Sequence, residues 1–177
     1  ENTTFRFAYG NSNQTGIVPN TELKRNTFRL TATTGVAKFK ISVSGAYTTI
    51  QDRKAQNGSN LSGVMLSLTR MPADFDILGG NGPNGFDNLD GSQHVYFSAY
   101  DNPLWSAYHN PNNTNLNRIS GAVGMDYLPT DWLTLTMRIG TDMYGDQRKQ
   151  IWDIGSQNFD PRGEIWEATV RHEEINT

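Results

Sequence analysis

Side chains alternate between apolar and polar over almost the whole of residues 115–146, apart from a short Pro-Thr-Asp segment near the middle. A repeat of two residues over this length is typical of β-strands, because successive side chains of a strand point to opposite faces. The pattern therefore predicts two long strands joined by a turn at 129–131. Their apolar sides comprise Ile119, Gly121, Val123, Met125 and Tyr127 in the first strand, and Leu133, Leu135, Met137, Ile139 and Met143 in the second.

The length of this turn predicts how the two strands pair. With three residues in the turn, Leu128 faces Trp132, and residues farther along keep apolar opposite apolar, such as Met125 opposite Leu135. A slip by one residue would place each apolar side chain of one strand against the polar side of the other. The sequence thus predicts a hairpin with one apolar face and one polar face.

The same alternation recurs in other parts of the chain. It predicts further strands at 3–9, 26–34, 39–50 and, less regularly, 163–173. The link at 35–38 is short enough for a second hairpin, which would pair Leu30 with Val43 and Ala32 with Ile41. We therefore predict an all-β fold, an antiparallel meander of about six long strands.

Segments rich in Asn, Gly and Pro separate the predicted strands and are typical of loops. These long loops are expected at 10–24, 51–114 and 147–162. Within the longest, apolar residues of 60–71 recur at helical spacing, with Ser59 or Asn60 available as the cap and Pro72 ending the helix. A connection of this length inside a compact domain is usually functional.

Composition excludes several classes of protein. The chain has no cysteine, so it has neither disulfides nor a thiolate site, and no run of Lys and Arg suggests a nucleic-acid partner. No apolar stretch approaches the ~18 residues of a membrane helix, and no leader peptide begins the sequence. Because the chain opens inside a predicted strand, we expect it to be a fragment of a longer polypeptide.

The arrangement of loops and the length of the strands favour a transmembrane β-barrel. Short turns lie at one end of the predicted strands and long loops at the other, as in outer-membrane barrels. The apolar run from Leu133 to Met143 covers ten residue-to-residue steps. That run corresponds to about 33 Å of strand, or roughly 25 Å of height at a tilt of about 40°. Since β-sandwiches also alternate, the open alternative is a secreted or surface β-sandwich module that binds glycans.

Several phrases of the sequence resemble one family of outer-membrane proteins. NQTGIVPN, NPLW and TDWLTLTMRIGTD are similar to the barrel region of SusC/RagA-type TonB-dependent transporters, and the resemblance runs over nearly the whole chain. It implies a barrel of about 22 strands with a plug, located in the bacterial outer membrane beneath a SusD-like surface lipoprotein. Such a transporter imports oligosaccharides or peptides. Residues 1–177 would form a single segment of that barrel, without the plug that contacts the TonB complex.

Two groups of residues are candidates for functional contacts. Long extracellular loops of this family line the cargo cavity or contact the lid protein, and aromatic side chains suit both roles. We therefore predict contacts with cargo or lid from Tyr96, Phe97, Tyr100, Trp105 and Tyr108; the alternative is that these rings pack the loop onto the barrel rim. On the polar face of the hairpin, we predict that Arg118, Asp126, Arg138 and Asp142 point into the lumen, with Arg118 opposite Asp142.

No constellation of residues indicates catalysis. The three histidines lack the spacing of metal ligands, and GGNGPNG lacks the lysine of a phosphate-binding loop. We therefore expect no catalytic residue, no metal and no cofactor, and we do not expect an enzyme.

Overall fold

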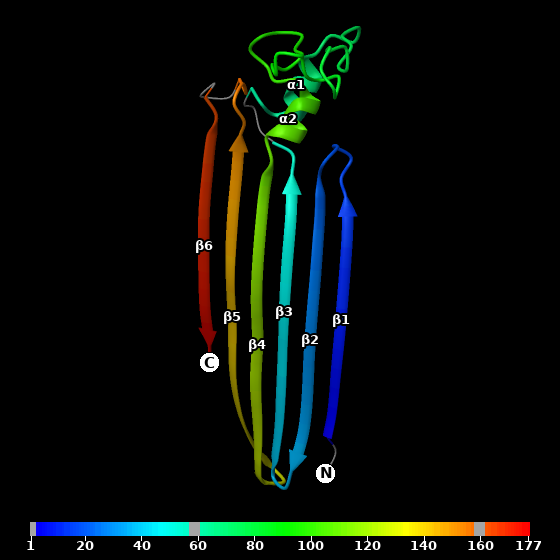
Figure 1. The fold of residues 1–177 in the computed structure, drawn as a ribbon. Coiled ribbons are helices and arrows are strands. Elements are labelled where there is room, and N and C mark those ends of the chain that lie inside the picture. The colour runs from blue at the N-terminus through cyan, green and yellow to red at the C-terminus, as the bar shows by residue number, and fades with distance from the viewer. Residues whose placement is uncertain (1–2, 57–60, 158–161) are drawn as a thin grey trace.

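The computed structural model describes residues 3–56, 61–157 and 162–177. They form one antiparallel sheet of six strands, in which each strand lies beside its neighbours in sequence (Figure 1). The strands are β1 (Thr3–Thr15), β2 (Glu22–Val36), β3 (Phe39–Lys54), β4 (Asn112–Thr130), β5 (Leu133–Trp152) and β6 (Glu164–Asn176). The predicted all-β meander is confirmed.

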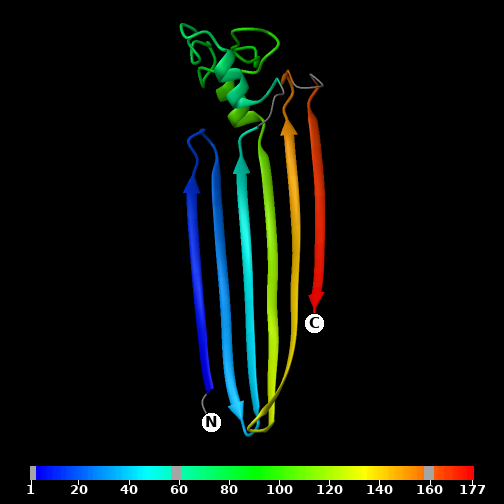
Figure 2. The same cartoon turned by 180° about the vertical axis from the view of Figure 1, so that it is seen from behind.

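The two ends of the sheet differ in their connections. Two-residue turns join β2 to β3 and β4 to β5 at one end. At the other end, the connection between β3 and β4 folds into a compact loop region that contains two short helices and stands beyond the strand ends (Figure 1). Seen from behind, the strands still form a single layer, and the loop region caps one end (Figure 2). The predicted separation of short turns from the longest loop is therefore present.

Two of the three predicted long loops are shorter than expected. Strand β1 continues to Thr15 and β2 begins at Glu22, while β5 continues to Trp152 and β6 begins at Glu164. Residues 10–15 and 22–24 of the first predicted loop, and residues 147–152 of the second, are therefore strand. Asn, Gln and Lys residues lower strand propensity, but the backbone ladder to neighbouring strands outweighs that local preference.

Both hairpins pair two residues away from the predicted register. Met125 lies opposite Met137 instead of Leu135, and Leu30 lies opposite Gly45 instead of Val43. In each hairpin the first strand extends two residues farther toward the turn than predicted, and an irregularity between Tyr127 and Thr130 adjusts the β4–β5 pairing. A shift of two residues keeps every side chain on its predicted face, because the side-chain period is also two.

The loop region contains two helices where one was predicted. Helix α1 (Val64–Arg70) lies inside the predicted segment 60–71 and ends before Pro72, but its cap residue is Gly63. The predicted caps Ser59 and Asn60 lie outside the described residues. Helix α2 (Pro103–His109) was not predicted. Among the described residues, neither helix has the length and apolar character needed to cross a membrane.

One face of the sheet carries a continuous apolar band that no other part of the described chain covers. Val123, Ile139 and Met137 are 50%, 42% and 56% exposed. In a β-sandwich a second sheet would bury these side chains, but the described residues form only one sheet. Residues 3–56, 61–157 and 162–177 therefore do not form a β-sandwich among themselves.

Aromatic side chains border the apolar band at both ends. Near the short turns, the rings of Phe39 and Tyr127 stack with centroids 4.7 Å apart. Toward the loop region the band ends at a row that includes Tyr9 and Tyr47, and the next row is polar. The Tyr9 hydroxyl donates to Asn26 Oδ1 of that polar row at 2.8 Å. The eight residue-to-residue steps from Phe39 to Tyr47 correspond to about 27 Å of strand.

Candidate functional site

A buried carboxylate holds the loop region together. Asp101 is fully buried, and its carboxylate accepts hydrogen bonds from four donors in two loops. Gln93 Nε2 donates to it at 2.7 Å, and Ser156 Oγ donates at 2.7 Å from the connection between β5 and β6. Because each donor satisfies part of a buried charge, Asp101 fixes the long loop against the neighbouring loop.

Asn102, the next residue, sets the start of α2. Its side-chain oxygen accepts from the backbone N–H groups of Leu104 at 2.9 Å and Trp105 at 3.3 Å, which caps the helix. Its side-chain nitrogen donates to the carbonyl oxygens of Ile77 at 3.0 Å and His94 at 2.7 Å. One buried amide therefore holds three separate segments of the loop in place.

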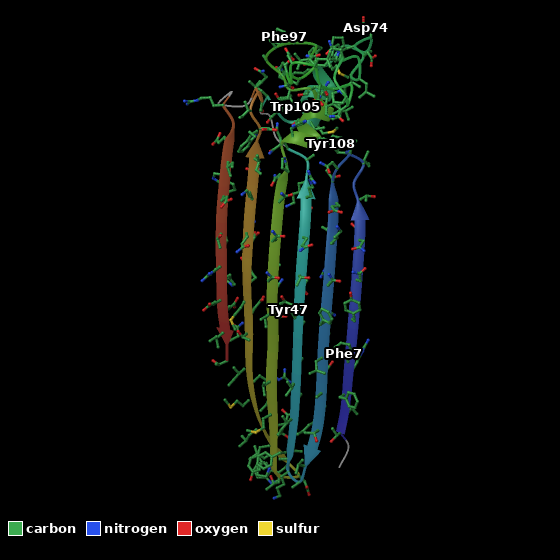
Figure 3. All side chains as sticks on the ribbon, in the orientation of Figure 1. Phe7, Tyr47, Asp74, Phe97, Trp105 and Tyr108 are labelled. Carbon is green, nitrogen blue, oxygen red and sulfur yellow. The ribbon has the colours of Figure 1, made fainter. Side chains whose placement is uncertain are left out.

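Six side chains of the loop region contact one another in a group that we call the apical cluster, because Phe97 lies at the outer edge of the region. It comprises Arg70, Phe75, His94, Tyr96, Phe97 and Tyr100. The rings of Tyr96 and Tyr100 stack at 6.1 Å, and the Arg70 guanidinium lies 5.4 Å from the Tyr100 ring centre while also donating to its hydroxyl. Phe97 is 55% exposed and lies at the outer edge of the region (Figure 3).

The hydroxyl of Tyr96 is the one polar atom of the apical cluster that is buried without a partner among the described residues. Burial raises the pKa of this phenol, and the nearby Tyr100 adds to the rise. The group therefore stays neutral at physiological pH and keeps an unused donor. An unsatisfied hydroxyl beside stacked rings suits a ligand that offers both an acceptor and a flat face.

The five predicted aromatic residues divide into two groups. Tyr96, Phe97 and Tyr100 lie together in the apical cluster, whereas Trp105 and Tyr108 lie nearer the strands (Figure 3). Tyr108 is half exposed and stacks on Phe86 at 5.4 Å.

Trp105 is buried in the loop region, unlike Phe97. Only 3% of it is exposed, and its ring stacks on His109 at 4.6 Å. Its place between α2 and the rest of the loop region makes it part of the loop core, so it offers no free ring face to a ligand. Trp105 therefore packs within the loop region itself, whereas the packing alternative places these rings against the barrel rim.

The four polar residues predicted to share a face do so. Arg118, Asp126, Arg138 and Asp142 all project from the side of the sheet opposite the apolar band. Arg118 forms a two-pronged ion pair with Asp142, with Nε 2.8 Å from Oδ1, although Asp142 lies directly opposite Ser120. The two residues therefore pair as predicted, but they lie diagonally across the two strands instead of directly opposite each other.

Sequence reasoning missed the residues that organise the loop. Asp101, Asn102 and Gln93 lie in segments that look like ordinary polar loop. The pair Asn102-Pro103 carried a usable signal, because Asn favours the N-cap and Pro the first helical position. Nothing local in the sequence marks Asp101, since its partners Ser156 and Gln157 are more than 50 residues away.

A comparison with models of known protein families gives no match, and a comparison with curated proteins gives none either. The resemblance to SusC/RagA-type transporters therefore stays a prediction.

Proposed function

We propose that this sheet is part of the barrel wall of a TonB-dependent importer in the bacterial outer membrane, of the SusC/RagA type. The observation that carries the proposal is the apolar band, which is wide, continuous and bordered by aromatic side chains at both ends. An apolar surface of this extent is unfavourable in water but is what lipid requires. At a tilt of about 40°, its span gives a height of roughly 21 Å, close to the ~25 Å apolar band of such barrels.

The opposite face supports a water-filled interior. It carries Ser, Thr, Gly and Ala with charged residues between them, and several of its acids are paired, as Asp142 is with Arg118 of the neighbouring strand and Asp146 is with Arg148 of the same strand. In a transmembrane barrel the interior is polar and the outward face apolar, with the alternation repeated along each strand. The two faces of this sheet follow that division.

A barrel of this kind requires more strands than the six described. An open edge cannot lie in lipid, because its backbone N–H and C=O groups would lack partners. On this proposal further strands, a plug and its contact with the TonB complex are contributed by other parts of the same polypeptide. The sheet itself is a static conduit and catalyses no reaction.

The loop region would face the cell exterior and meet a SusD-like surface lipoprotein or the cargo, an oligosaccharide or peptide. The apical cluster supports this role, because Phe97 exposes its ring and the Tyr96 hydroxyl has no partner among the described residues. The polar network around Asp101 keeps this surface rigid, which lowers the entropy lost on binding.

Cysteine scanning tests the proposal. In a cysteine-free background of the full-length protein in liposomes, single cysteines at Val123, Met137 and Ile139 should resist a membrane-impermeant maleimide. Those at Ala122, Thr136 and Arg138 should react. Fluorophores on the first three should be quenched by nitroxide-labelled lipid tails, because those positions face lipid.

The pattern of labelling decides the outcome. Labelling that alternates from one residue to the next along β5, and between Ala122 and Val123 in β4, supports a band that faces the membrane. If Met137 and Ile139 react with the impermeant maleimide as fast as Thr136 does, the band faces water and the barrel proposal fails. If neither face reacts and neither is quenched by lipid, a second protein layer covers the band, which also contradicts the proposal.

A further inference from the structure

The β1–β2 hairpin carries an unbalanced positive charge on its polar face. Arg6, Arg25 and Arg29 project from this face, and neither strand places an Asp or Glu there. Arg6 lies opposite Thr31 and Arg29 lies opposite Ala8, so these two arginines are diagonal neighbours across the strands. Like charges at such positions repel each other, and the hairpin itself supplies nothing to offset the repulsion.

The neighbouring part of the same face is different. On β4 and β5, Arg118 pairs with Asp142, and Arg148 pairs with Asp146. By contrast, Arg6, Arg25 and Arg29 form no ion pair with any residue in the described ranges 3–56, 61–157 and 162–177. Arg138 on β5 also forms no ion pair among the described residues, so what distinguishes the β1–β2 hairpin is that it carries three such arginines on a face with no acid.

A trough of about 580 Å³ lies beside two of these arginines. Arg6 and Arg29 line one side, and Asp142, already bound to Arg118, lies at the other. Small side chains between them keep the trough open, and hydroxyl groups are available at its floor. These floor residues are Ala8, Thr31, Ser44, Ala46, Ser120 and Gly140.

We propose that Arg6 and Arg29 form an anion-binding subsite, and that the cargo of this transporter is an acidic oligosaccharide whose carboxylates bind there. This inference rests on the proposed function. A guanidinium matches a carboxylate with two parallel hydrogen bonds, and rows of Arg select anions in channels and pores. Arg25 continues the positive charge toward the loop region, which is the side from which cargo would arrive.

The composition of the trough favours a saccharide over an acidic peptide. Thr31, Ser44 and Ser120 offer hydroxyls that exchange hydrogen bonds with sugar hydroxyls. A peptide bound in an extended form also needs apolar pockets for alternate side chains. The side chains that project from this face into the trough include no large apolar group, since Leu30, the one large apolar residue in its lining, projects from the opposite face.

The experiment compares two ligands that differ only in charge. Binding of tetragalacturonic acid and of its fully methyl-esterified form is measured by calorimetry on the detergent-purified full-length protein. We expect the acid to bind at least about tenfold more tightly. The double variant R6Q/R29Q should bind both ligands equally, whereas R6K/R29K should retain part of the preference because it keeps the charge.

Arg171→Gln is the matched control, because it removes one positive charge from the opposite face of β6 and should leave the preference unchanged. Equal binding of acid and ester by the wild-type protein overturns the proposal, as does a preference that survives in R6Q/R29Q. If R6Q/R29Q lowers the melting temperature without ligand and the wild type shows no preference, an acidic segment of the protein itself occupies the arginines, which also refutes the subsite. The cysteine scan tests whether the apolar band faces lipid and does not depend on ligand binding. Either proposal can therefore fail while the other holds.

Discussion

The sheet and the loop region of this chain obtain their order in opposite ways. The sheet exposes large apolar side chains on one face and has almost no core of its own, whereas the loop region buries Val64, Phe86 and Trp105 among polar groups. In the loop, buried polar atoms such as the Asp101 carboxylate are matched by donors from several segments. The loop region is therefore organised by its own contacts, and the sheet by its backbone ladder together with its surroundings.

Because of this difference, the two regions should be sensitive to different substitutions. A buried polar network fails when one partner is removed, because the remaining groups lose both water and hydrogen bonds. An apolar face in lipid fails when a charge is introduced, because the charge must leave water. The loop region should therefore be most sensitive to the loss of a polar partner, and the apolar face of the sheet to an introduced charge.

Asp101→Ala should give the largest effect and should be confined to the loop region. Removing the carboxylate takes this acceptor from the buried side chains of Gln93, Asn110 and Ser156 and from the Gln157 backbone N–H, which we expect to cost about 3–5 kcal/mol of local stability. Hydrogen exchange of residues 61–110 in the full-length protein measures it, with the exposed Asp74→Ala as the matched control (Figure 3). Equal protection in both variants would show that the network does not hold the loop.

Ile139→Arg should destabilise the sheet by about 2–4 kcal/mol in a membrane, because it places a charge in the middle of the apolar band. Thr134→Arg, on the opposite face of the same strand, is the control and should change stability little. Urea-dependent refolding into liposomes gives both values. If the two variants are equally stable, the assigned facing of β5 is incorrect.

Phe97→Ala should weaken contact with the cargo or the lid lipoprotein by about 1 kcal/mol or more, since exposed aromatic anchors contribute strongly to binding. The fold should be unaffected, because Phe97 is largely exposed. Co-purification of the lipoprotein and oligosaccharide uptake by cells are the measurements. Leu89→Ala, which removes a more exposed apolar side chain elsewhere in the loop region, should change neither.

The smallest expected effect concerns Asp90. Hydrogen bonds from the Ser92 side chain, and then from its backbone N–H, lower the pKa of this exposed carboxyl. A lowered pKa means that the carboxylate stabilises the turn above the ordinary Asp value of about 3.9, and that this contribution is lost as pH falls through the lowered value. The Ser92 amide resonance should therefore shift at acidic pH in the wild type and not in Asp90→Asn. A pH-independent resonance in the wild type would contradict the assigned bonds.

The strands could be predicted from the sequence, but their ends and pairing could not. Alternation assigned Val123, Met137 and Arg138 to their faces, because the face depends only on the parity of each position. The predicted register was two residues off in both hairpins, because a turn predicted from composition does not determine which residues form the last pair before the turn. The polar extensions of β1 and β5 were mistaken for loop because their residues have low strand propensity.

The candidate site also has parts that could be predicted from the sequence and parts that could not. The aromatic segment was recognised from its composition, yet only the structure separates the exposed Phe97 from the buried Trp105. It also brings Arg6 beside Arg29, on a strand that the sequence treats as an ordinary amphipathic run.

The sequence by itself determined the amphipathic strands, their two faces and the separation of short turns from the long loop, because these properties arise between residues close together in the chain. Only the tertiary structure decided which polar side chains are buried, how the loops are tied to each other and where unpaired charge gathers. Gln93 meets Gly155, and Asp101 meets Ser156, across more than 50 residues of sequence. Burial and pairing of this kind depend on which distant segments meet, and no local pattern encodes that.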